Sequence, residues 1–209
     1  MTKKDIFIGF IIGLVIGVLL IPTLSNINLL SKLQTLLGGS QVAAGIFLMA
    51  FFSIGAALGV IVAGFIGRSV PVIWQIAKFG LVGVLNTAVN FAVLNILIAA
   101  TGIDMGNGFA VLTGIAFVVA VTNSFFWNEH WVFAGRQDNQ ARQFLTFFIV
   151  SLVALGGVAL IGKFMTQYIA PPASLDSKQW ANVAAVVGVV FSLVWNYLGY
   201  KFIVFRKKA

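Results

Sequence analysis

Six long runs of apolar residues divide this chain, and they restrict its fold more than any other feature. Each is close to the length of about 20 residues that a helix needs to cross about 30 Å of hydrocarbon. The runs cover residues 6–23, 42–67, 79–100, 106–127, 144–163 and 180–200. They lack the alternating polarity of barrel strands. The composition, with 60% hydrophobic and only 9% charged residues, is not that of a soluble domain. The sequence predicts an all-α integral membrane protein with six transmembrane helices.

The positions of the basic residues predict how these helices are oriented. Lys and Arg next to membrane spans stay on the cytoplasmic side. With both termini in the cytoplasm, ten of the 13 basic residues lie inside: Lys3, Lys4, Arg68, Lys78, Arg136, Arg142, Lys201, Arg206, Lys207 and Lys208. Only Lys32, Lys163 and Lys178 lie outside. We therefore predict a multi-pass protein of the cytoplasmic (inner) membrane, whose net charge of +8 reflects orientation and contact with membrane lipids, with no nucleic acid as partner.

The first 70 residues are predicted to form a separate transmembrane hairpin. A secretory signal peptide is the alternative for the first run, but no small-x-small cleavage site follows it, which favours a retained helix. Small residues recur every four positions in both helices, at Gly9, Gly13 and Gly17 and at Gly55, Gly59 and Ala63. This spacing allows close helix packing in a bilayer. The connection, residues 25–39, has the pattern of a short interfacial helix with a glycine stop on the outer surface, its apolar side carrying Ile27, Leu30, Leu33 and Leu37.

A repeated sequence closes two of the later runs. Ser124–Phe133 reads SFFWNEHWVF, and Asn196–Phe205, 72 positions further on, reads NYLGYKFIVF. Each is the end of a pair of spans that begins with basic or amide residues, near Gln75 in the first pair and Gln143 in the second. Residues 71–209 are therefore predicted to form a four-helix unit of two parallel two-helix repeats, at about 74–133 and 142–205. Such repeats often carry a substrate path at their interface, although duplication alone does not prove transport.

The residue types exclude much of enzyme chemistry. The chain has no cysteine and a single histidine, His130, so thiolate sites and histidine clusters are excluded within one chain. Its five acidic residues are scattered over segment ends, leaving no carboxylate pair for acid–base catalysis. We predict a protein that is not an enzyme and that has no metal and no cofactor.

The later part of the chain resembles the GtrA-like family of four-span membrane proteins. The resemblance rests on Lys78-Phe79-Gly-Leu-Val-Gly83 at the start of a span and on the two Val-Phe endings, and it covers about Trp74 to Phe205. It implies a part in surface polysaccharide or cell-wall glycan synthesis, by translocation of a polyprenyl-phosphate-linked sugar. The family usually has a basic residue where this chain has Glu129. Of the two equivalent positions, only Lys201 therefore matches the basic residue that the resemblance implies.

A lipid-linked sugar needs cations near its phosphate and neutral polar groups for its hydroxyls. Cations suitably placed near the inner interface are Lys78, Lys201 and Arg206. Amides and other polar groups of the spans and their ends are Asn86, Thr87, Asn90, Asn123, Asn128, Glu129, His130 and Asn196. Asn86 and Asn90 share one helix face, and Glu129 and Lys201 occupy equivalent slots where they could pair. For each of these residues the alternative is a structural one: a packing hydrogen bond, or for Glu129 a solvated interfacial charge.

Two other functions remain open. Four-span bundles can export small cationic metabolites or drugs, but such exporters normally use a carboxylate within the membrane, and no acid lies in the middle of a span here. The chain could instead be a non-transporting partner of a membrane glycosyltransferase. A four-span unit is small for enclosing a lipid headgroup, so we also expect a homodimer.

Overall fold

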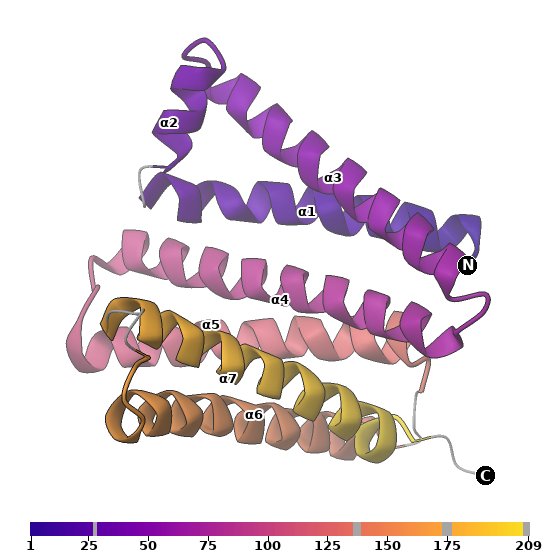
Figure 1. Cartoon of the computed structure of the whole chain (residues 1–209). Helices are drawn as coiled ribbons and strands as arrows, with labels where there is room; N and C mark the ends of the chain where they lie inside the picture. Colours follow the sequence, from indigo (N-terminus) through magenta and orange to yellow (C-terminus); the bar gives the residue numbers. More distant parts are fainter. Residues whose placement is uncertain (27–28, 136–138, 173–176, 207–209) are drawn as a thin grey trace. The chain divides into compact units, whose positions relative to one another are not determined.

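The computed structural model (Figure 1) describes residues 1–26, 29–135, 139–172 and 177–206. Within these residues lie seven α-helices and two short π-helical segments, and no β-strand. They are α1 (Lys3–Asn26), α2 (Leu29–Leu36), α3 (Gln41–Ile66), α4 (Pro71–Thr101), α5 (Gly106–Trp127), η1 (Asn128–Val132), α6 (Gln140–Tyr168), α7 (Ser177–Gly199) and η2 (Tyr200–Val204). Six of the helices are long and apolar enough to cross a membrane. The prediction of an all-helical chain with six candidate spans is thus confirmed.

Several helices extend beyond the apolar runs that predict them. α4 begins at Pro71, eight residues before the predicted span, because proline is favoured in a first helical turn, where its missing N–H would have no partner. It ends at Gly102, whose φ of 70° is left-handed, a conformation that suits glycine. α6 begins earlier than predicted at an Asn139 cap, whose side chain accepts a hydrogen bond from the Arg142 N–H. These extra turns place polar side chains such as Gln75 and Gln143 on regular helix.

The predicted interfacial helix is present as α2. Leu30 is buried and packs with Ala44 and Leu48 of α3. The predicted glycine stop is also present, since Gly38 and Gly39 both have positive φ and end the helix. Ile27, predicted on its apolar side, lies outside the described residues, and the position of α2 on the outer surface stays a prediction.

Contacts group the chain into two compact units, Met1–Val132 and Phe133–Ala209. In the first unit, α1 packs against α3 and α4, and α4 packs against α5. In the second unit, α6 and α7 lie side by side, with η2 continuing α7 (Figure 1). The predicted domain boundary near residue 70 stays a prediction.

Close packing of α1 on α3 confirms one half of the small-residue prediction. Gly9, Gly13 and Gly17 are all buried, and a Cβ on Gly13 would collide with the backbone of Phe52 and Ser53. The other half is wrong, because Gly55 and Gly59 are exposed and a Cβ on either would have no neighbour within 4 Å. α3 turns a different stripe toward α1, including Leu48, Met49, Phe52, Ser53 and Val60.

Candidate functional site

Both copies of the repeated sequence end in a π-helical turn. η1 spans Asn128–Val132 and η2 spans Tyr200–Val204, and these segments occupy equivalent positions 72 residues apart. In η2 the wide turn is closed by the Phe205 N–H, which donates to the carbonyl of Tyr200 at 2.8 Å. π-helical turns are rare and frequently occur at functional sites. They therefore single out these two helix ends.

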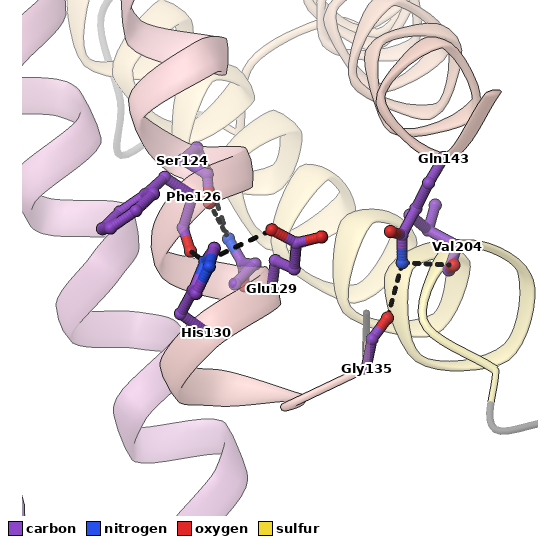
Figure 2. A network of polar contacts seen from close by, with 8 residues as sticks. Ser124, Phe126, Glu129, His130, Gly135, Gln143 and Val204 are labelled. Carbon is purple, nitrogen blue, oxygen red and sulfur yellow. Dashed lines mark hydrogen bonds and ion pairs between the residues drawn. The ribbon is translucent and has the colours of Figure 1, made fainter. Parts of the chain in front are cut away.

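A glutamine side chain binds the last carbonyl of each π-turn. In the first unit, Gln75 Nε2 donates to the Val132 carbonyl at 3.4 Å. In the second unit, Gln143 Nε2 donates to the Val204 carbonyl at 3.3 Å and to that of Gly135 at 2.5 Å (Figure 2). Sequence reasoning did not select these glutamines as site residues. The signal that could have found them is their shared place, at the start of the first helix of each predicted repeat.

Lys78 lies among aromatic groups at the η1 end of α5. It stands in the second turn of α4, and its ammonium donates a hydrogen bond of 2.7 Å to the carbonyl of Trp131. The same nitrogen lies 5.2 Å from the ring centre of Trp74 and 5.6 Å from that of Trp131. Both distances are within the range of cation–π attraction. The predicted cation is therefore half-buried, with one of its three N–H groups bound to protein backbone.

Asn128, Glu129 and His130 form a dense polar group on η1, as the sequence predicts. Asn128 is fully buried, and its Nδ2 donates to the carbonyl of Ser124 at 2.8 Å, while its Oδ1 has no partner among the described residues. His130 Nδ1 lies 2.9 Å from the Phe126 carbonyl and 3.3 Å from Glu129 Oε2 (Figure 2). Since a carbonyl only accepts hydrogen bonds, Nδ1 carries the proton. The His130 side chain as a whole is 46% exposed.

Glu129 itself is only 4% exposed, which does not fit the alternative of a solvated interfacial charge. Its predicted pairing with Lys201 joins residues of different units and stays a prediction.

Asn86 and Asn123 lie on α4 and α5, two helices that pack against each other. Asn86 is eight residues beyond Lys78, about 12 Å along α4 at the rise of an α-helix. Asn86 Oδ1 and Asn123 Nδ2 are buried and have no hydrogen-bond partner among the described residues. Asn90, one turn beyond Asn86, is half-buried. The first unit thus holds an unused acceptor and an unused donor on two helices that pack against each other.

The second unit carries the remaining predicted residues. Asn196 Nδ2 donates to Ser192 Oγ at 3.3 Å, whereas its buried Oδ1 has no partner among the described residues. Lys201 Nζ donates to the Tyr197 hydroxyl at 3.2 Å and lies 5.2 Å from the centre of that ring. Arg206 is exposed, while Arg136, Lys207 and Lys208 lie outside the described residues. In the part of the chain that is described, no group of three or more His, Asp or Glu side chains could hold a metal ion.

Six helices long and apolar enough to cross a membrane define a polytopic membrane protein. A family model for the GtrA/DPMS transmembrane domain matches residues 78–205, well over half of the chain. The chain belongs to this family, which confirms the resemblance noted in its sequence. Neither a curated protein nor a solved structure matches it.

Membership indicates a role in handling lipid-linked sugars for glycan synthesis, in a family of generally non-catalytic membrane proteins. α1, α2 and α3 lie outside the matched residues.

Proposed function

We propose that this protein translocates a polyprenyl-phosphate-linked sugar across the cytoplasmic membrane for surface polysaccharide or cell-wall glycan synthesis. The observation that carries the proposal is the set of unpartnered amide atoms buried on α4, α5 and η1, at Asn86, Asn123 and Asn128. A buried polar atom without a partner costs about 1–3 kcal/mol. A ligand with many hydroxyl groups would supply the missing partners during transport.

Lys78 has the properties of a phosphate contact in this proposal. Two N–H groups of its ammonium remain after the bond to the Trp131 carbonyl, and charge-assisted bonds to phosphate are the stronger kind. Asn86 lies about 12 Å further along α4. This separation allows the phosphate to remain at Lys78 while the sugar meets the amides. Lys201 and Arg206 would serve the phosphate in the second unit.

The proposal includes the finer architecture. The two π-turns, the two glutamine contacts and the 72-residue spacing support two parallel repeats, α4 with α5 and α6 with α7. Both termini would be cytoplasmic, so Lys78 would stand at the inner interface. The partners would be the lipid-linked sugar, membrane lipids, a membrane glycosyltransferase and a second copy of the chain.

The test replaces the unpartnered amides by leucine. Asn86→Leu and Asn123→Leu remove buried polar atoms that bind nothing in the described fold, so we expect melting temperatures equal to or above that of the wild type. Transfer of a labelled polyprenyl-phosphate sugar between leaflets of proteoliposomes should fall by roughly tenfold. The matched control is Thr122→Val, since Thr122 is exposed and, among the described residues, its hydroxyl donates to the Val118 carbonyl of its own helix.

A purely structural role for the amides would give the reverse pattern. Melting temperature would then fall in both leucine variants, and transfer would fall only in proportion to lost folded protein. Normal transfer in both variants would contradict the site assignment.

A further inference from the structure

The first turn of α1 brings a carboxylate to the same π-turn that Lys78 contacts. Asp5 Oδ1 accepts a hydrogen bond of 3.0 Å from the indole Nε1 of Trp131. Its other oxygen, Oδ2, accepts bonds from the backbone N–H and the hydroxyl of Thr2, at 2.7 and 2.8 Å. The side chain is therefore held in place from two directions. Because α1 lies outside residues 78–205, this acid comes from outside the family domain.

Trp131 contacts both charged groups at once. Its backbone carbonyl accepts the bond from Lys78, and its indole N–H donates to Asp5. The opposite charges of Asp5 and Lys78 also attract each other. They form no direct ion pair within 4.0 Å among the described residues, so the ammonium keeps N–H groups for another anion. Lys78, Trp131 and Asp5 thus place a cation, an aromatic ring and a carboxylate together at one helix end.

A half-buried lysine at the end of a membrane span is costly without an anion nearby. Asp5 supplies that anion when no substrate is bound. A phosphate can replace it, because an ammonium forms charge-assisted hydrogen bonds with phosphate as it does with carboxylate. Departure of Asp5 would also release the indole N–H of Trp131, which would give the phosphate a second donor beside Lys78.

We infer that Asp5 is the resident counter-ion of Lys78, and that the phosphate of a lipid must compete with it to bind there. The inference rests on the proposed function, since it concerns the same phosphate site. It assigns a role to the N-terminal helix: α1 sets the affinity of the family domain for its anionic ligand. Only a lipid phosphate strong enough to displace the carboxylate then binds well.

The experiment measures binding of a polyprenyl monophosphate to the full-length protein in phosphatidylcholine nanodiscs. Asp5→Asn removes the charge, keeps one oxygen as acceptor for the Trp131 indole, and offers an amide N–H to the Thr2 hydroxyl, so we expect binding to tighten by roughly fivefold. Asp104→Asn is the matched control, because Asp104 is an exposed acid beyond the opposite end of α4, and it should bind as the wild type does. Lys78→Gln should weaken binding, and Asp5→Asn should then bring no further gain in the double variant.

Two further titrations separate the inference from the proposed function. Polyprenol without phosphate should bind much more weakly than polyprenyl phosphate, and inorganic phosphate should compete only at far higher concentration. Equal binding of polyprenol, or equal competition by inorganic phosphate, would contradict a lipid-phosphate site and so the proposed function.

Tight binding of polyprenyl phosphate with no effect of Asp5→Asn would overturn the inference alone. A fivefold gain that persists in the Lys78→Gln background would also overturn it, because Asp5 would then act through general charge and not through Lys78.

Discussion

Gln75 and Gln143 each donate a side-chain hydrogen bond to the last carbonyl of a π-turn, but the two side chains differ in burial. Gln143 is 2% exposed and bonds to two backbone carbonyls, whereas Gln75 is half-buried and its described bond to Val132 is longer. A buried carbonyl that loses its donor costs about 1–3 kcal/mol. The two side chains should therefore contribute unequally to stability.

Replacing each glutamine by leucine tests this difference. We expect Gln143→Leu to lower the free energy of unfolding by about 2 kcal/mol and Gln75→Leu by about half as much, because Gln143 is buried whereas Gln75 is half-buried. The measurement is thermal unfolding of each purified variant in the same detergent. An equal or larger loss in Gln75→Leu would show that burial at these two sites does not set the cost.

Tyr200 offers a second test at the residue scale. Its hydroxyl lies 2.7 Å from Ser151 Oγ, and its ring stacks on Phe147 with centres 3.9 Å apart. Tyr200→Phe keeps the stack, and Ser151 keeps its bond to the Phe147 carbonyl, so the loss should be about 1 kcal/mol. Tyr200→Leu loses the stack as well and should cost about 2 kcal/mol more. Denaturant titration of the two variants should rank them in this order, and the reverse ranking would contradict the role of the ring.

At the scale of elements, the contact between α1 and α3 depends on glycine on one side only. Gly13 has no room for a side chain, whereas Gly59 faces open space on α3. We expect Gly13→Leu to cost about 3 kcal/mol, because the backbones must separate. Gly59→Leu should leave the melting temperature unchanged. A loss at Gly59 equal to that at Gly13 would show that a second copy of the chain covers this face, and would support the predicted homodimer.

The elements also show what the sequence can and cannot predict. The spans follow from apolar run length, since every backbone group in hydrocarbon must bond within its own helix. The stripe of Gly9, Gly13 and Gly17 is periodic and therefore visible. Its partner surface on α3 uses ordinary residues such as Phe52 and Val60, which carry no spacing signal. The π-turns are likewise invisible, because Asn128–Val132 has no composition that distinguishes a π-helix from an α-helix.

The candidate site also has residues that the sequence can predict and contacts that it cannot. Lys78, Asn86, Asn123 and Asn128 could be selected from sequence, because polar residues in apolar spans are rare and costly. The contact of Asp5 with Trp131 could not, since 126 positions separate the two residues and no local pattern relates them. The contacts of Gln75 and Gln143 could not be predicted either, because each glutamine bonds to a carbonyl that is far away in the sequence.

At the scale of the whole molecule, the orientation in the membrane follows from the charge pattern and can be tested directly. The chain has no cysteine, so single cysteines give labelling without background. Ser69, between α3 and α4, and Asp104, between α4 and α5, are both exposed. With cytoplasmic termini, an impermeant maleimide should label Asp104→Cys in intact spheroplasts and Ser69→Cys only after permeabilisation. Labelling of Ser69→Cys in intact spheroplasts would reverse the assigned topology.

The most direct test of the central claim is leaflet transfer by the wild-type protein alone. The purified chain is reconstituted into vesicles with a labelled polyprenyl-phosphate sugar, and the fraction of sugar accessible from one side is followed with time. We predict transfer far above that of protein-free vesicles, and none for a phospholipid that lacks a sugar. Transfer no faster than in empty vesicles, from protein shown to be folded, would contradict translocation.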